Sequence, residues 1–179
     1  MEQLIKKSLT RAKICEEVKP GPNSIVIFGA SGDLTFRKLI PSIFALYNKG
    51  LLPKQFYMLG VARTKYTDEE YRNEVKRRLL EENKDLNNVS SFIERLFYIS
   101  GNYDEDSLYK LLQEKLNSLD KMFETQQNHI FYLATPPSIY LEIIRRLGQF
   151  GLTKENSGGY SRVIIEKPFG SNLETAIEL

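Results

Sequence analysis

The sequence is poor in several residue types, and their scarcity narrows the possible functions. Among 179 residues it has one cysteine, one histidine and no tryptophan. A single cysteine excludes an internal disulfide and fits a reducing compartment. Cys15 has no neighbouring base or cation to activate it, so we interpret it as an inert thiol rather than a nucleophile. We expect no metal site.

The sequence also lacks a strong excess of either charge and any long apolar run. Its 25 basic and 23 acidic residues leave a net charge of +2, which gives no case for nucleic-acid or acidic-membrane binding. No apolar run approaches the roughly 20 residues that span a bilayer. Residues 1–18 mix charged and apolar side chains and do not form a secretory signal. We therefore expect a cytoplasmic protein with neither a nucleic-acid nor a membrane partner.

Strand and helix patterns alternate along the rest of the chain. We expect strands at Ser24–Phe28, Phe56–Ala62, Leu96–Ile99, His129–Ala134 and Arg162–Glu166, and we expect the last of these to be buried. Helices are expected at Arg37–Lys49, Asp68–Glu82, Val89–Arg95, Asp104–Leu119, Pro137–Leu147 and from Asn172 onward. This order predicts an α/β fold, a Rossmann-like doubly wound parallel sheet with helices on both faces.

Two domain boundaries follow from the same pattern. The breaker cluster Lys19–Asn23 separates an N-terminal arm, residues 1–22, from one domain, residues 23–179. The helix from Asn172 looks unfinished, so we expect the chain to be part of a longer protein. Local signals mark two helix ends: Thr67 with Glu70 forms a capping box, and Gly50 is a residue that ends a helix.

The most informative segment is the turn after the first expected strand. Gly29-Ala-Ser-Gly32 follows an apolar strand and precedes a helix, the context in which glycines let a diphosphate approach the backbone. The helix N-terminus then offers free N–H groups and a positive dipole to the anion. The spacing departs from Gly-x-Gly-x-x-Gly, and a tight turn without a ligand is the alternative. Asp33 suits a helix N-cap.

The end of the second expected strand indicates which dinucleotide binds. NAD-binding folds usually place Asp or Glu there, against the ribose 2′-hydroxyl. This strand ends in Ala62-Arg63-Thr64-Lys65 instead, and arginine grips a 2′-phosphate with two hydrogen bonds. Ser31 adds a hydroxyl donor. The pattern favours NADP, the alternative being that Arg63 is a solvated surface charge.

Three segments resemble the glucose-6-phosphate dehydrogenase family. They are Gly29–Pro41, Ala134–Pro137 and Ile165–Gly170, in the family's order, with Gly60–Arg63 and Asn102–Asp104 also in place. The resemblance runs from about Ser24 to the last residue. It implies an N-terminal NADP-binding domain whose larger C-terminal catalytic domain is absent from this chain. It also implies oxidation of glucose 6-phosphate to 6-phosphogluconolactone, with hydride passing to NADP.

The resemblance further implies roles for individual residues. Arg63 binds the 2′-phosphate, and Lys38 and Lys167 lie where substrate and cofactor meet, with the Lys167–Pro168 bond cis. Residues expected to line the diphosphate and ribose are Gly29, Ala30, Ser31, Gly32, Asp33, Leu34, Thr35 and Phe36. Residues expected to flank the adenine or nicotinamide are Tyr103, Ala134, Pro136 and Tyr140.

The resemblance places the general base outside this sequence. The family's catalytic histidine and sugar-phosphate segment lie beyond residue 179, and His129 at a strand start is interpreted as structural. Alone, the chain is therefore expected to bind NADP without oxidising sugar, while the full-length protein is a homo-oligomer. Phe36 stands where the family more often has a basic or small residue.

Two other functions remain open from sequence. One is a sugar oxidoreductase of the glucose–fructose oxidoreductase type, which shares a Glu-Lys-Pro segment but usually keeps the regular glycine spacing. The other is a non-catalytic NADP-sensing module.

Overall fold

The computed structural model describes residues 19–82, 88–155 and 158–167. Cys15, most of the expected N-terminal arm, Pro168 and the helix expected from Asn172 lie outside the described residues. The cis Lys167–Pro168 bond therefore stays a prediction.

The described chain is built around one parallel sheet of five strands. The strands are β1 (Asn23–Phe28), β2 (Phe56–Ala62), β3 (Leu96–Ser100), β4 (His129–Leu133) and β5 (Ser161–Ile165). Their order across the sheet is β3-β2-β1-β4-β5, and each neighbouring pair is parallel. The chain thus builds outward first to one side of β1 and then to the other. This confirms the doubly wound sheet.

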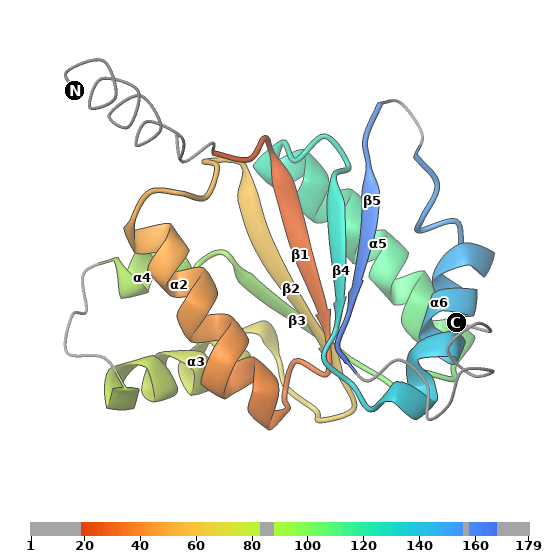
Figure 1. The fold of residues 1–179 in the computed structure, drawn as a ribbon, viewed down its shortest axis with the longest axis horizontal. Helices are drawn as coiled ribbons and strands as arrows, with labels where there is room; N and C mark the ends of the chain where they lie inside the picture. Colours follow the sequence, from red (N-terminus) through yellow and green to blue (C-terminus); the bar gives the residue numbers. More distant parts are fainter. Residues whose placement is uncertain (1–18, 83–87, 156–157, 168–179) are drawn as a thin grey trace, which may run out of the picture.

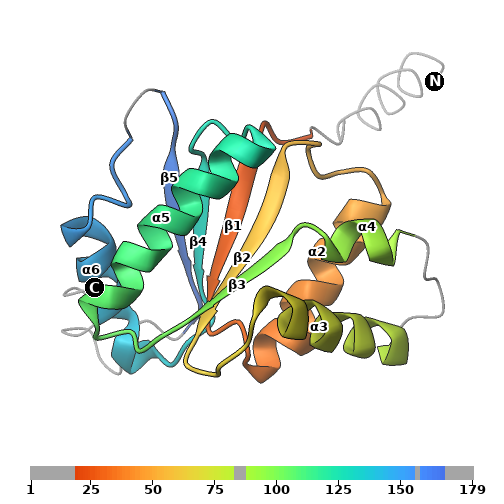
Figure 2. The same cartoon turned by 180° about the vertical axis from the view of Figure 1, so that it is seen from behind.

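Helices cover both faces of the sheet. One face carries α2 (Ile40–Asn48), α3 (Asp68–Glu82) and α4 (Val89–Ile93) (Figure 1). The other carries α5 (Asp106–Phe123) and α6 (Tyr140–Gln149), and α5 crosses the sheet in the reverse view (Figure 2). Short turns precede two helices: the π-helical turn η1 (Thr35–Leu39) and the 3₁₀ turn η2 (Pro137–Ile139).

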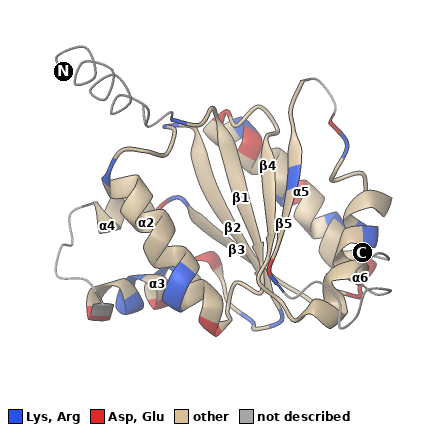
Figure 3. Cartoon of the chain, viewed as in Figure 1, with Lys and Arg blue, Asp and Glu red and all other residues tan. Residues whose placement is uncertain are grey.

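The apolar strands explain this three-layer arrangement. Strands β1 to β4 carry no Lys, Arg, Asp or Glu, and the charged residues lie on helices, loops and β5 (Figure 3). A parallel strand with both faces apolar must be covered twice. Two core clusters result, one under α5 and α6 around Phe28 and Phe131, the other under α2 to α4 around Met58 and Phe92.

Local sequence signals set several element ends as expected. Thr67 and Glu70 form the capping box, with Glu70 N–H donating to Thr67 Oγ1 at 3.2 Å and Thr67 N–H to Glu70 Oε2 at 2.7 Å. Gly50 follows α2 with φ +66°. The bounds of β2 and α3 agree with those expected.

Two expectations were wrong. Asp33 is not an N-cap: it lies in the first helical turn and pairs with Arg37 across 3.1 Å. The last strand was expected to be buried, but β5 is an edge strand of the described sheet, with Val163 40% and Ile164 42% exposed. An apolar run alone does not tell an edge strand from a central one. None of the helices in the described part is long and apolar enough to cross a bilayer.

Candidate dinucleotide-binding site

A cavity lies where the sheet order reverses, at the carboxyl ends of β1 and β4. Parallel α/β sheets bind ligands at this switch point. The cavity measures about 190 Å³, and it is lined by Gly29, Ser31, Gly32, Ala62, Arg63, Thr64, Tyr103, Ala134, Thr135, Pro136 and Ile139. Seven of the residues predicted from sequence are among them: Gly29, Ser31, Gly32, Arg63, Tyr103, Ala134 and Pro136.

The turn after β1 has a shape that only glycine allows at its first position. Gly29 has φ +86°, and a Cβ atom there would lie 2.3 Å from Ala134 O. The close contact lets the turn lie directly against the start of the loop after β4. Gly32 N–H donates to Gly29 O at 2.9 Å and closes the turn. The helix that follows therefore points its N-terminus at the cavity.

The first helical turn is anchored from below by buried side chains. Thr35 is fully buried, and its Oγ1 donates to Gly29 O at 3.0 Å. Phe36 is 3% exposed and packs against Tyr71 with ring centroids 6.1 Å apart. Ile40 N–H donates to Thr35 O, the wider spacing of a π-helical turn, a feature frequent at functional sites.

Three tyrosine hydroxyls hold the two turns that border the cavity. Gly29 N–H donates both to Val61 O at 2.9 Å and to Tyr103 OH at 3.1 Å. Tyr71 OH donates to Ala30 O at 3.3 Å, and Tyr98 OH donates to Thr64 O at 2.7 Å. Burial raises the pKa of Tyr98 to about 12, so it stays protonated as a donor at neutral pH.

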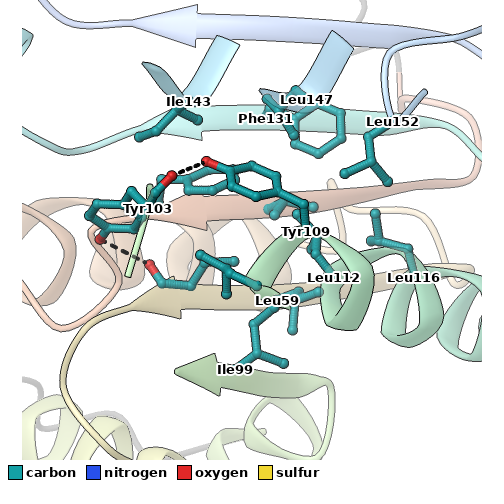
Figure 4. Close-up of a cluster of buried hydrophobic side chains, with 14 of the residues drawn as sticks. Leu59, Ile99, Tyr103, Tyr109, Leu112, Leu116, Phe131, Ile143, Leu147 and Leu152 are labelled. Carbon is teal, nitrogen blue, oxygen red and sulfur yellow. Dashed lines mark hydrogen bonds between the residues drawn. The ribbon is translucent and has the colours of Figure 1, made fainter. Parts of the chain in front are cut away.

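Tyr103 also links the cavity to the core. Its backbone carbonyl accepts a hydrogen bond of 2.8 Å from the buried Tyr109 hydroxyl (Figure 4). Its ring packs 6.0 Å from Phe28 at the end of β1. The ring therefore sits between the binding turn and the cluster under α5 and α6.

Arg63 lies at the boundary between this cavity and a second one. The second cavity measures about 480 Å³ and shares Arg63, Tyr103 and Ile139 with the first. Its remaining lining residues are Asn102, Asp104, Glu105 and Glu142. Arg63 is exposed and makes no ion pair with any residue in the described part of the chain. Beside it, Ser31 Oγ and Thr64 Oγ1 lie 2.8 Å apart and present two hydroxyls.

Several predicted contacts lie elsewhere. The side chains of Ala30, Thr35 and Phe36 are buried beneath the turn, so they shape it rather than line the cavity. Tyr140 is 1% exposed in the core under α5 and α6, because α6 turns this position of its first turn inward. Asp33, Leu34, Lys38 and Lys167 are exposed and line neither cavity.

Tyr140 nevertheless lies beside the segment that carries Lys167. Burial raises the pKa of its hydroxyl, and the neighbouring Glu166 backbone lowers that pKa. The Glu166 carboxylate accepts a hydrogen bond from Tyr132 OH. Burial and the Glu166 carboxylate raise the pKa of Tyr132 to about 12. The Tyr132 hydrogen bond therefore holds the chain immediately before Lys167.

Sequence reasoning missed five residues of this site. Ala62, Thr64, Thr135 and Ile139 line the cavity, and Gly60 lies under the turn, where a Cβ would meet Ala30 Cβ at 2.7 Å. Thr64 and Thr135 stand inside segments that were singled out, so their hydroxyls were the signal available. Gly60 stands in the Gly60–Arg63 segment that resembles the family, but the need for a bare α-carbon arises from a contact across the sheet that the sequence does not show.

The opposite end of the sheet holds a different polar cluster. His129 is 8% exposed, and its Nε2 lies 2.9 Å from Asp120 Oδ2. Asp120 Oδ1 accepts hydrogen bonds from Tyr57 OH, at 2.8 Å, and from Thr125 Oγ1. A hollow of about 400 Å³ lies beside them, at the amino ends of the strands. The buried pairing supports the structural interpretation of His129.

Comparison with known proteins agrees with this geometry. The family model described as "Glucose-6-phosphate dehydrogenase, NAD binding domain" matches residues 26–179. The chain belongs to the glucose-6-phosphate dehydrogenase family. This assignment decides against the glucose–fructose oxidoreductase type.

Glucose-6-phosphate dehydrogenases from distant organisms are similar to the chain. Glucose-6-phosphate 1-dehydrogenase of Aggregatibacter actinomycetemcomitans is 42% identical over 153 residues, 85% of this chain and 31% of that protein. "Glucose-6-phosphate 1-dehydrogenase 5, cytoplasmic" of Arabidopsis thaliana is 36% identical over 166 residues, 89% of this chain and 32% of that protein. The chain thus spans about a third of the length of these relatives.

A solved structure shows the same fold. It is described as glucose-6-phosphate dehydrogenase in complex with its substrate glucose-6-phosphate, with a TM-score of 0.77 and 35% identity. The match covers 89% of this chain and 33% of that one.

Proposed function

We propose that this chain is the NADP-binding part of a glucose-6-phosphate dehydrogenase. The observation that carries the proposal is the placement of Arg63. Its guanidinium has no carboxylate partner in the described residues. It borders the cavity that lies against the glycine turn, residues 29–32. An unpaired cation beside two hydroxyls suits a phosphate monoester.

The cavity fits a dinucleotide in both shape and donor chemistry. The diphosphate would lie against Gly29 and Gly32, where the first helical turn directs N–H groups and a positive dipole end. The adenosine half would lie toward β2 and Arg63, and the nicotinamide half toward β4. Bound NADP supplies the hydride acceptor, and the protein supplies binding and orientation.

The position of the 2′-phosphate follows from the surrounding charges. Asp104, Glu105 and Glu142 line the second cavity, and their carboxylates repel a phosphate. Ser31 and Thr64 line the first cavity together with Arg63, and the hydroxyls that they present to it carry no charge and can donate to a phosphate. We therefore place the 2′-phosphate between Arg63 and this hydroxyl pair, and the adenine toward the second cavity.

The full-length protein would oxidise glucose 6-phosphate to 6-phosphogluconolactone. Oxidation requires a base for the hydroxyl proton, and the one histidine of this sequence is buried against Asp120. The base would come from the remaining two thirds of a full-length relative. Lys167 and Lys38 would reach substrate and cofactor there, and Asp33, Leu34 and Tyr140 would act through the turn and the Lys167 segment. We further propose that the enzyme is a homo-oligomer. We also propose that it is cytoplasmic, the location that the name of the Arabidopsis relative gives for that protein.

Calorimetric titration of the chain with NADP and with NAD tests the cofactor assignment. We expect NADP to bind at least about tenfold more tightly, since a bidentate phosphate contact contributes about 1.5–3 kcal/mol. Arg63→Ala should remove the preference by weakening NADP alone. Arg77→Ala, an exposed α3 arginine paired with Glu74 and Glu81, is the matched control. Equal affinities for the two coenzymes in the unmodified chain would contradict the assignment.

A non-catalytic NADP-sensing module would give the same binding result. The two functions separate when the chain is joined to the rest of a full-length relative: the enzyme reduces NADP in the presence of glucose 6-phosphate, and the sensor does not.

A further inference from the structure

Thr135 has an unusual position in the cavity. Thr135 is 8% exposed, and its Oγ1 is buried without a hydrogen-bond partner among the described residues. No other buried side-chain oxygen or nitrogen in residues 19–82, 88–155 and 158–167 lacks a partner. Buried hydroxyls are nearly always paired, because an unpaired one destabilises the folded state. The exception lies in the wall of the proposed coenzyme site.

The side chain reaches the cavity by a small movement. Thr135 Cγ2 lies 3.3 Å from the position that a Cβ atom on Gly29 would occupy, so the methyl group faces the glycine turn. A turn of about 120° around χ1 moves a threonine between staggered rotamers and can bring its hydroxyl to the position that its methyl group occupied. One such step places Oγ1 against the turn where the diphosphate is proposed to lie.

We propose that Thr135 is a coenzyme-binding residue whose hydroxyl donates a hydrogen bond to the nicotinamide half of NADP. The proposal rests on the proposed function. Thr135 follows β4, on the opposite side of β1 from β2 and Arg63. The adenosine 2′-phosphate is held on the Arg63 side, so the oxygens nearest β4 are those of the nicotinamide ribose and its phosphate. Binding gives the orphan hydroxyl the partner that it lacks within the described chain.

Thr135→Val tests the proposal because valine has the same shape without the hydroxyl. We expect the variant to bind NADP about tenfold more weakly, while its melting temperature is unchanged or higher. Its affinity for 2′,5′-ADP, which lacks the nicotinamide half, should equal that of the unmodified chain.

Thr125→Val is the matched control. Thr125 is fully buried like a core residue, and its Oγ1 donates to Asp120 at the other end of the sheet. The same substitution there should lower the melting temperature and leave NADP affinity unchanged. The two variants therefore shift stability and affinity in opposite patterns.

The other results each overturn the proposal. Unchanged NADP affinity in Thr135→Val shows that the hydroxyl makes no contact, while the proposed function stands. Equal weakening of NADP and 2′,5′-ADP shows that the contact is not to the nicotinamide half. If the unmodified chain binds no NADP, the proposed function fails, and this inference fails with it.

Discussion

Polar groups at one end of the parallel sheet are paired with one another, whereas two at the other end lack partners among the described residues. At the amino ends of the strands, Asp120 bonds to His129, Tyr57 and Thr125, and every one of these groups is buried. At the carboxyl ends, Thr135 has an unpaired hydroxyl and Arg63 has no ion-pair partner in the described residues. Polar groups that satisfy one another stabilise a fold, whereas groups left unpaired beside a cavity are available to a ligand.

Cavity size alone does not identify the coenzyme-binding end of the sheet. The hollow of about 400 Å³ at the amino ends is larger than the cavity of about 190 Å³ that the glycine turn borders. Its neighbour Asp120 already has three hydrogen-bond partners within the fold. The smaller cavity combines a helix N-terminus, an available guanidinium and an orphan hydroxyl.

The largest effect, on stability, is expected at the amino ends of the strands, where Asp120 is paired. Asp120→Ala leaves His129, Tyr57 and Thr125 without their common acceptor, and each buried polar group left unsatisfied costs about 1–3 kcal/mol. Urea unfolding should show this loss in the free energy of unfolding. At protein concentrations and temperatures where the variant is folded, NADP affinity should be unchanged. A tenfold loss of affinity would remove the contrast between the two ends.

Gly29→Ala should lower both the stability of the chain and its affinity for NADP. The left-handed backbone alone costs about 1–3 kcal/mol, and the new Cβ would approach Ala134 O to 2.3 Å. We expect lower stability together with loss of measurable NADP binding. Gly148→Ala is the control, because a Cβ there meets nothing within 4 Å and alanine favours a helix. Normal NADP binding by Gly29→Ala would show that the turn does not hold the diphosphate.

Tyr103→Phe should loosen the turn with a smaller effect on stability. Gly29 N–H keeps Val61 O as acceptor, so the loss is that of the two hydrogen bonds of the Tyr103 hydroxyl, about 0.5–1.5 kcal/mol each. NADP affinity should fall several-fold, as measured by titration. Tyr47→Phe on α2 is the control, far from the cavity linings. If both variants lose the same affinity, the Tyr103 hydroxyl has no specific role.

The smallest expected effect is the pH dependence of the stability that Asp120 contributes at the amino ends of the strands. Burial alone would raise the pKa of Asp120, but hydrogen bonds from His129, Thr125 and Tyr57 and the His129 charge hold that pKa below its ordinary value. This stabilisation is therefore complete above the unfolded pKa of about 3.9 and is lost as the pH falls through the folded pKa. The difference in unfolding free energy between the unmodified chain and Asp120→Asn should shrink below about pH 4, by at most about 1.4 kcal/mol per pH unit. A constant difference down to pH 2 would contradict the pairing.

The fold could be predicted from sequence because its signals are local. The apolar run of β2 and the capping box of α3 set the bounds of both elements, and the turn at Gly29 was visible as glycines after a strand. The exposure of β5 was not predictable, since it depends on where the sheet ends. Asp33 was misplaced because the helix begins one residue earlier, where Gly32 O accepts the hydrogen bond from Phe36 N–H.

Site residues were predictable where they stand at strand ends or in segments that resemble the family. Gly29, Gly32 and Arg63 follow directly from strand ends, and they line the cavity. Tyr140 was expected to flank the coenzyme but is buried, because the register of α6 relative to the sheet decides which way it points. Thr135 Oγ1 is unpaired because no polar group of the described chain forms a hydrogen bond with it. This depends on the whole surrounding structure, so a local sequence pattern cannot show it.

Amide chemical-shift mapping of the chain during titration with NADP shows which end of the sheet binds the coenzyme. We expect shifts at Gly29, Gly32, Arg63 and Thr135, with none at Asn128 and His129. Shifts centred on Asn128 and His129, or no shifts at saturating NADP, would contradict the proposed binding site.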